Sequence, residues 1–284
     1  MPSFTTADGR KLVYREDGRG PVLVCHPGGP GFSSRYFVDL AGLSAHRTLV
    51  LLDPRGTGGS SPPPNGSYEI ADYAADLDEL RQHLGLERID LLGHSHGGVI
   101  AQAYAAANPD RVGKLVLAST LARFQIEQHE AMEKGMATKA HEPWFADAQA
   151  ALEAEQAGQF GSDDELLALC LREMPFYFAT YGAAEQEFVT YMGKDVICGA
   201  ALKAFNDDIF TTFDLRSVLP QITAPTLVIA GTEDFITGPL CARELGELVP
   251  GARLRLLDGV GHMIFVEARD DVRAVILEFL DEPA

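Results

Sequence analysis

The stretch "LLGHSHGG", residues 91–98, decides the fold that this sequence predicts. The apolar residues "IDLLG" (89–93) predict a buried strand, and "GGVIAQAYAAANP" (97–109) predicts a helix that ends at its proline. A Gly-x-Ser-x-Gly turn between a strand and a helix holds its serine in a strained conformation above the edge of a sheet. Ser95 is therefore the candidate nucleophile. The alternative is a phosphate-binding turn, but that loop would place a lysine after the glycines, and none is present here.

A serine hydroxyl becomes an effective nucleophile only when a base takes its proton. His262 is the best-placed histidine, because "LDGVGHMIFVE" (257–267) connects the last predicted strand to the last predicted helix. The base needs a carboxylate that fixes its tautomer. Asp234 follows the strand predicted over 225–231, and Glu233 is the alternative. The chain order serine, aspartate, histidine is the one expected when the serine lies on such a turn.

A second glycine-rich loop follows the strand predicted within "PVLVCHPGGPGF", residues 21–32. Glycines let a backbone approach another group closely, and the neighbouring prolines stiffen the loop. An oxyanion formed at Ser95 needs two hydrogen-bond donors. We expect one from the backbone N–H of His96 and the other from Gly29, with Gly28 as the next candidate. The alternative is an ordinary tight turn.

Strands and helices alternate along most of the chain, which predicts an α/β fold with a doubly wound, mostly parallel sheet. The rhythm breaks after residue 120, and no convincing strand appears before residue 214. We therefore expect a core built from residues 1–120 and 214–284, with an all-helical cap inserted over 121–213. The remaining strands are predicted over 11–16, 21–25, 47–53, 112–120 and 253–258.

The composition and net charge of the chain limit which partners and which cellular compartment we expect. The chain has 284 residues, of which 46% are hydrophobic, and a net charge of −18, which disfavours nucleic acid and anionic membranes as partners. No stretch approaches the roughly 18 apolar residues of a membrane span. The first residues lack the pattern of a secretion signal, so we expect a cytoplasmic protein. The four cysteines lack metal-ligand spacing. No metal or organic cofactor is expected, and a homo-oligomer is left open.

Three motifs, taken in order, resemble those of the α/β-hydrolase fold, and specifically its proline iminopeptidase branch with its esterase relatives. They are "HPGGPG" (26–31), "DPRGTGGS" (53–60) and "GHSHGG" (93–98). The resemblance covers about residues 10–120 and 214–284. It implies that the catalytic serine, aspartate and histidine of that branch correspond to Ser95, Asp234 and His262. It also implies that the second motif is structural, with Asp53 and Arg55 paired near the site.

The sequence departs from that branch in its cap. Such enzymes usually have a tryptophan after the nucleophile, where this chain has His96, and a Trp-Glu motif with further glutamates that hold the substrate's ammonium group. Here the single tryptophan, Trp144, precedes a phenylalanine, and the acids at 185, 187, 207 and 208 match no such pattern. The aromatic run "MPFYFATYG" (174–182) is more prominent. We expect an apolar substrate pocket lined by Phe176, Tyr177, Phe178, Tyr181 and Trp144, unless these rings only pack the cap helices together.

The leading hypothesis is therefore a serine hydrolase that forms an acyl-enzyme with small or medium apolar carboxylic esters. The second is a proline iminopeptidase, which removes an N-terminal proline. The third is a non-hydrolytic use of the fold, in acyl transfer, perhydrolysis or ligand sensing. The partner in each case is a small molecule. A buried carboxylate that could bind an amine would separate the first two hypotheses, because an apolar ester requires none.

Overall fold

The computed structural model describes residues 1–283 and, within them, every side chain except that of Asp208. In this range the chain forms an eight-stranded sheet with the order β1-β2-β4-β3-β5-β6-β7-β8. Strands β3 to β8 run parallel, and the edge pairs β1–β2 and β2–β4 are antiparallel. The predicted α/β class is confirmed. The strands are β1 Ser3–Thr5, β2 Lys11–Gly18, β3 Val22–His26, β4 Thr48–Leu52, β5 Ile89–His94, β6 Val112–Ala118, β7 Thr226–Gly231 and β8 Arg253–Leu257.

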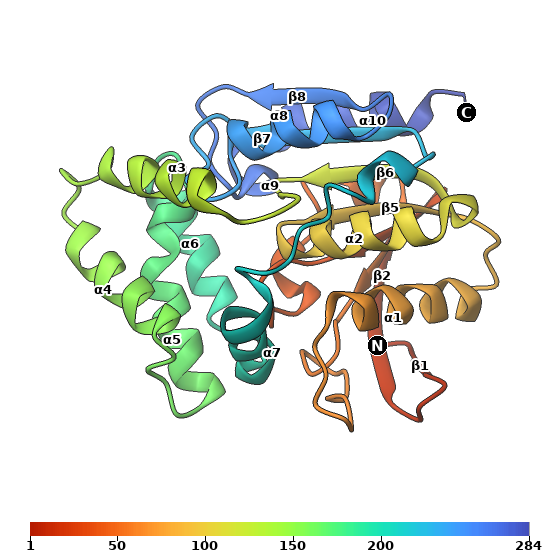
Figure 1. Ribbon diagram of the computed structural model, residues 1–284, viewed down its shortest axis with the longest axis horizontal. Coiled ribbons are helices and arrows are strands. Elements are labelled where there is room, and N and C mark those ends of the chain that lie inside the picture. The colour runs from red at the N-terminus through yellow and green to blue at the C-terminus, as the bar shows by residue number, and fades with distance from the viewer. Residues whose placement is uncertain (284) are drawn as a thin grey trace.

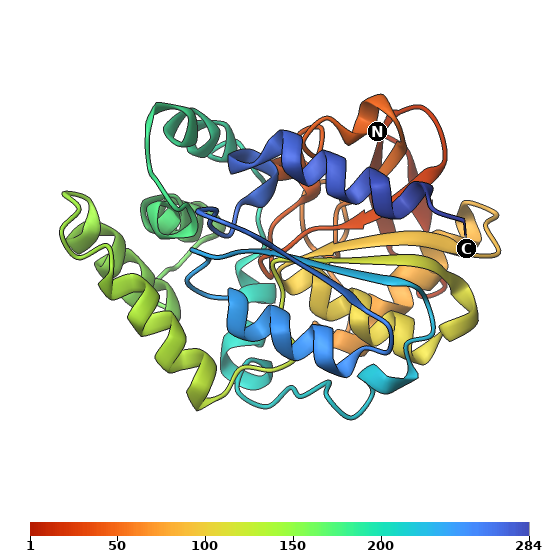
Figure 2. The ribbon, with the colours of Figure 1, turned by 90° about the horizontal axis from the view of Figure 1, so that it is seen from above.

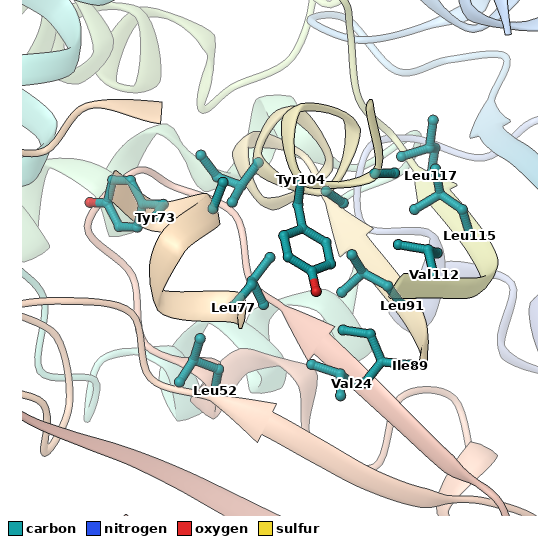
Figure 3. Close-up of a cluster of buried hydrophobic side chains, with 14 of the residues drawn as sticks. Val24, Leu52, Tyr73, Leu77, Ile89, Leu91, Tyr104, Val112, Leu115 and Leu117 are labelled. Atoms are coloured by element: carbon teal, nitrogen blue, oxygen red, sulfur yellow. The ribbon is translucent and has the colours of Figure 1, made fainter. Parts of the chain in front are cut away.

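Helices cover both faces of the sheet because its central strands are apolar on both sides. In β3, Val24 packs into one hydrophobic cluster, whereas Leu23 and Cys25 pack into another on the opposite face. The first face carries α1 Ile70–His83, α2 His96–Ala107 and α8 Pro239–Leu248, and the second carries α10 Arg269–Asp281 (Figure 2). Figure 3 shows the first cluster, where the ring of Tyr104 from α2 lies among side chains of the central strands and Leu77 of α1.

The chain between β6 and β7 forms the cap, which lies beside the core at the left of Figure 1. The arrowheads of β6 and β8 point toward it. Arg123 and Asp214 form an isolated antiparallel bridge, so the chain enters and leaves the cap side by side. The cap elements are α3 Ile126–Ala137, α4 Phe145–Gln156, α5 Asp163–Glu173, the 3₁₀ turn η4 Met174–Tyr177, α6 Ala183–Met192, α7 Gly199–Ala204 and the π-helical turn η5 Phe205–Ile209.

Helices α4 and α7 lie in the segment expected to be all helical, but no apolar pattern marks either helix individually, and strand β1 had no counterpart among the sequence-based expectations. Strand β1 has three residues and α7 has six, which is too short for a periodic apolar pattern. Helix α4 buries mostly alanine, so its apolar face is weakly marked in the sequence. Short turns join the remaining elements: η1 Ser34–Phe37, η2 Leu43–Ala45, η3 Pro109–Arg111, η6 Leu219–Gln221 and the one-turn helix α9 Ile264–Glu267. Within residues 1–283, no helix is long and apolar enough to cross a membrane.

Candidate active site

Ser95 occupies a strained turn between β5 and α2, with φ 54° and ψ −124°. A positive φ is rare for a residue with a side chain and persists only where the surrounding structure imposes it. The flanking glycines allow this close packing. A Cβ on Gly93 would lie 2.3 Å from the carbonyl oxygen of Gly97, and one on Gly97 would lie 2.2 Å from that of His26. The turn therefore requires glycine on both sides of the serine.

His262 and Asp234 meet at the same edge of the sheet. Nδ1 of His262 lies 2.9 Å from Oδ2 of Asp234, and the two residues are 2% and 6% exposed. Glu233, the alternative acid, is exposed. The imidazole lines the same cavity as Ser95, and its Nε2 has no hydrogen bond to any other described residue. The pair has the geometry of a general base held by a carboxylate.

Thr237, which the sequence did not single out, completes the support of Asp234. Its hydroxyl donates to Oδ2 at 2.7 Å, and the N–H groups of Ile236 and Thr237 donate to Oδ1 at 3.0 and 2.9 Å. Burial acts to raise the pKa of Asp234, but the charge of His262 and these hydrogen bonds outweigh it, and the pKa is lowered. Asp234 is therefore held as a carboxylate.

The glycine-rich loop after β3 lies directly against the serine. A Cβ on Gly28 would be 2.7 Å from Cβ of Ser95. The N–H of Gly29, at φ 117°, has no hydrogen bond to another described residue, and the N–H of His96 is the first of α2 and has no acceptor within the helix. The N–H of Gly28 instead donates to the hydroxyl of Tyr36 at 2.5 Å. This corrects the expectation for Gly28, whose donor is already used, and leaves Gly29 and His96.

A hydrogen-bonded chain that the sequence did not indicate joins this loop to the histidine. The Tyr36 hydroxyl lies 2.7 Å from Nδ1 of His94, and Nε2 of His94 lies 3.2 Å from the carbonyl oxygen of His262. Burial, followed by the charge of His262, lowers the pKa of His94 to about 3, so its ring is neutral and carries one proton. With that proton on Nε2, the chain runs from the N–H of Gly28 through Tyr36 and His94 to the backbone of His262.

A cavity of about 370 Å³ lies between the core and the cap, above Ser95. Of the five aromatic residues expected to line it, only Tyr177 does so among the described residues. Phe176 is fully buried and makes an edge contact with Trp144 at 5.3 Å. The rings of Phe178 and Tyr181 contact each other, with their centroids 5.9 Å apart. For these four residues the expectation is corrected, because their rings pack the cap together. Besides Tyr177, the phenylalanine and tyrosine residues that line the cavity are Phe32, Tyr36, Phe124, Phe205 and Phe210.

Two carboxyl groups that the sequence did not single out line the cavity. Glu155, in α4, is 6% exposed, and its one hydrogen bond accepts from Nδ2 of Asn206 at 3.2 Å. Glu173, at the end of α5, is 5% exposed, and its Oε2 has no hydrogen-bond partner among the described residues. Within residues 1–283, neither forms an ion pair with a lysine or arginine. Both are thus buried acids without a cation.

Burial perturbs both acids. It raises the pKa of Glu155 to about 7, against the smaller opposite effect of Asn206. It raises the pKa of Glu173 well above the usual range, with a further contribution from Glu155. Helical spacing in the sequence could have indicated that these acids are buried, although not that they line the cavity: Glu173 follows Leu166 and Cys170 on the buried face of α5. Glu155 similarly follows Ala148, Ala151 and Leu152 on α4.

The cap acids noted in the sequence lie elsewhere. Glu187 and Asp207 are exposed, and Asp207 pairs with Lys203. Glu185 caps α6 by accepting the N–H of Gly182 at 2.9 Å. The side chain of Asp208 lies outside the described residues. Glu185, Glu187 and Asp207 therefore do not form the polar part of the cavity wall.

The "DPRGTGGS" loop has the expected structural role but not the expected pairing. Asp53 accepts from the hydroxyl of Ser34 at 2.8 Å and from the N–H of Gly59 at 3.2 Å. Arg55 binds Asp76 at 2.8 Å. Asp53 and Arg55 thus hold different neighbours. Among residues 1–283, no group of three or more His, Cys, Asp or Glu side chains is placed to hold a metal ion.

Comparisons with known proteins agree with this architecture. A model of the α/β-hydrolase fold matches residues 21–268. A proline iminopeptidase from Lactobacillus helveticus (strain DPC 4571) is 29% identical over 96% of this chain and 93% of its own length. The enol-lactonase from Burkholderia xenovorans LB400 is 26% identical with a TM-score of 0.70, over 99% of this chain and 100% of that one.

An esterase from Exiguobacterium antarcticum has the same fold, with 22% identity and a TM-score of 0.77 over 99% of both chains. The matched family model spans most of the chain, including both loops at the site and the segment with His262. The chain is therefore a hydrolase that belongs to the α/β-hydrolase fold family.

Proposed function

We propose that this chain is a serine hydrolase that forms an acyl-enzyme on Ser95 and acts on small molecules with a basic amine near the scissile carbonyl. N-terminal proline peptides are such substrates. The observation that carries the proposal is the pair of buried acids, Glu155 and Glu173, that line the catalytic cavity without a cation. The geometry therefore favours the aminopeptidase hypothesis over the apolar-ester hypothesis that led from the sequence.

The proposed reaction has two halves. Oγ of Ser95 attacks the carbonyl carbon while Nε2 of His262 takes the hydroxyl proton, and Asp234 stabilises the resulting imidazolium. The N–H groups of Gly29 and His96 stabilise the oxyanion. His262 then gives the proton to the leaving nitrogen, the C–N bond breaks, and the acyl group stays on Ser95. Water attacks the acyl-enzyme with His262 again as base, which releases the acid and restores Ser95.

Ionising the buried acids Glu155 and Glu173 costs free energy unless a ligand supplies a positive charge beside them. Burying a carboxylate without a partner is strongly unfavourable, so without a cationic ligand the two acids keep their protons to a higher pH than a free glutamate does. An ammonium group within hydrogen-bond distance favours the ionised carboxylate. A cationic substrate therefore gains an ion pair that a neutral ester lacks.

Hydrolysis of apolar esters remains a second candidate, because one observation favours it. Most of the cavity wall is apolar or aromatic, and apolar groups gain roughly 25 cal/mol per Å² on burial. Protonated Glu155 and Glu173 would then act as neutral hydrogen-bonding groups.

A parallel assay of proline p-nitroanilide and p-nitrophenyl butyrate separates the two candidates. We expect efficient cleavage of the anilide, and none by the Ser95→Ala variant. The role of the amine is checked with N-acetylproline p-nitroanilide, because the acetyl group removes the positive charge and leaves the scissile bond unchanged. We expect this acetylated substrate to be cleaved much more slowly than the free one. Equal cleavage of acetylated and free substrates would contradict amine recognition. Cleavage of the butyrate alone would favour the ester hydrolase.

A further inference from the structure

A three-residue segment of the cap, 177–179, runs along the loop that carries His262; we call it the strap. It begins at the last residue of η4 and leads toward α6. The carbonyl oxygen of Tyr177 accepts the N–H of His262 at 2.8 Å and that of Met263 at 3.3 Å. The backbone of the candidate base is thus held by the cap as well as by the core.

Glu267, at the end of α9, connects the strap to the same loop. Its Oε2 accepts the N–H of Ala179 at 2.7 Å, and its Oε1 accepts the N–H of Gly261 at 3.1 Å. Gly261 directly precedes His262. A Cβ at Gly261 would lie 2.6 Å from the nitrogen of Ala179 and 2.8 Å from Oε1 of Glu267. One carboxyl group therefore holds the strap and the His262 loop in close contact.

Lys139, which follows α3, also holds the strap. Its Nζ donates to the carbonyl oxygens of Phe178 and Ala179 at 2.9 and 2.8 Å. The three carbonyl groups of the strap and the N–H of Ala179 are therefore all bonded to groups outside it. Glu267 and Lys139 together fix where the strap lies.

The strap also contacts the space that a substrate would fill. The Tyr177 side chain lines the cavity, and its ring makes an edge contact with the ring of His262, with centroids 5.4 Å apart. The same residue therefore contacts the substrate site through its side chain and the candidate base through its carbonyl group.

We propose that Glu267 is a positioning residue for His262: its carboxylate fixes the strap against the His262 loop and so holds the imidazole in the orientation needed for proton transfer with Ser95. This inference rests on the proposed function, because it requires His262 to be the base. Glu267 does not line the cavity and contacts no reacting atom; it acts through the N–H of Gly261 and through the strap.

The surroundings of Glu267 place its ionisation near neutral pH. Burial raises the pKa of Glu267 to about 7. The two N–H groups that donate to its carboxylate lower the pKa, whereas the negative charges of Glu185 in α6 and Asp234 after β7 raise it further. Lys139 is the cation that faces it, and Glu233 also acts on that lysine. The carboxylate accepts both N–H groups above this pH. Below it, a proton occupies one of the accepting oxygens, so the hold on the loop weakens as pH falls.

Glu267→Gln tests the proposal, because the amide keeps one acceptor oxygen and presents an NH₂ group to the other N–H. Glu185→Gln is the matched control: it makes the same charge change at the same junction and leaves the strap bonds intact. The readouts are kcat and KM with p-nitrophenyl butyrate and the rate at which a fluorophosphonate labels Ser95. In that reaction the serine oxygen bonds to phosphorus, fluoride leaves, and His262 takes the proton.

We expect Glu267→Gln to lower kcat and the labelling rate about tenfold, or about 1.4 kcal/mol, with KM changed less than threefold. The pH profile of Glu267→Gln should lose one ionisation near pH 7 and keep those of the other titrating groups of the site, whereas Glu185→Gln should keep the full wild-type profile. Loss of folded protein alone changes neither the shape of a pH profile nor KM. If Glu267→Gln does not fold, Lys139→Met serves, and we expect the same loss of kcat because it removes the hydrogen bonds to the carbonyl oxygens of Phe178 and Ala179 that also fix the strap.

Two results would overturn the proposal in distinguishable ways. Suppose that the fluorophosphonate labels Ser95 in the wild type, and that Glu267→Gln and Lys139→Met are labelled at the wild-type rate with the wild-type pH profile. Glu267 then does not position the base. If the wild type is not labelled at Ser95 at all, the proposed function fails and the inference fails with it.

Discussion

Glu155→Gln is the most informative single change, because it alters the charge of the cavity and little else. The amide oxygen of glutamine can still accept from Nδ2 of Asn206, which lies 3.2 Å from Oε1 in the wild type. What disappears is a titratable group whose pKa is about 7 instead of 4.5. The substitution therefore removes both the cost of ionising a buried acid and the carboxylate that we propose binds an amine.

The effect on stability follows from the pKa. The folded state holds the Glu155 proton more tightly than the unfolded chain does, so the wild type loses stability as pH rises from about 4.5 through about 7. A difference of about 2.5 pKa units corresponds to about 3 kcal/mol. The variant should match the wild type at pH 4.5 and exceed its free energy of unfolding by up to about 3 kcal/mol at pH 9, as measured by urea denaturation without ligand.

The effect on activity should have the opposite sign. Removing one partner of a buried charge pair costs about 2–5 kcal/mol, so kcat/KM for proline p-nitroanilide should fall at least thirtyfold. For p-nitrophenyl butyrate, kcat/KM should change less than about tenfold. Glu187→Gln, an exposed acid of the same cap, is the control and should leave stability and both activities unchanged. Equal loss with both substrates, or stabilisation without any loss of anilide cleavage, would refute amine recognition by Glu155.

The remaining predictions concern the reacting groups and their support. Ser95→Ala should fold normally and lose about 10⁴-fold or more in turnover, and mass spectrometry should find a fluorophosphonate label on Ser95 only; full activity in this variant would exclude it as the nucleophile. Asp234→Asn should lower kcat about 10⁴-fold, while Glu233→Gln stays near the wild type; the reverse pattern would assign the acid to Glu233. Tyr36→Phe removes the acceptor of the Gly28 N–H and the donor to His94, so we expect kcat to fall about tenfold with a smaller change in KM. Unchanged kcat for Tyr36→Phe would show that the glycine loop keeps its position without this chain.

The sequence by itself determined the core and the place where the candidate catalytic residues meet. The turn at Ser95 is specified locally, because only glycine fits at Gly93 and Gly97. His262 and Asp234 each follow a strand of one parallel sheet, so the topology brings them to the same edge without any knowledge of the cap. Short-range sterics and the alternation of strands and helices carry this part of the fold.

Only the tertiary structure decided which cap residues face the cavity. Glu155 and Glu173 belong to neighbouring helices, α4 and α5, and their placement depends on how those helices pack against each other and against the core. The aromatic run was conspicuous in the sequence, yet Phe176 and Phe178 are fully buried, and among the described aromatic residues of the run only Tyr177 lines the cavity. The use of the Gly28 N–H by Tyr36 was equally hidden, because a motif shows that a donor exists but not which acceptor has already taken it. The local sequence does not distinguish between the faces of a cap helix or between possible hydrogen-bond partners, and long-range packing selects among them. In this chain the selected arrangement changes the proposed substrate from an apolar ester to an amine.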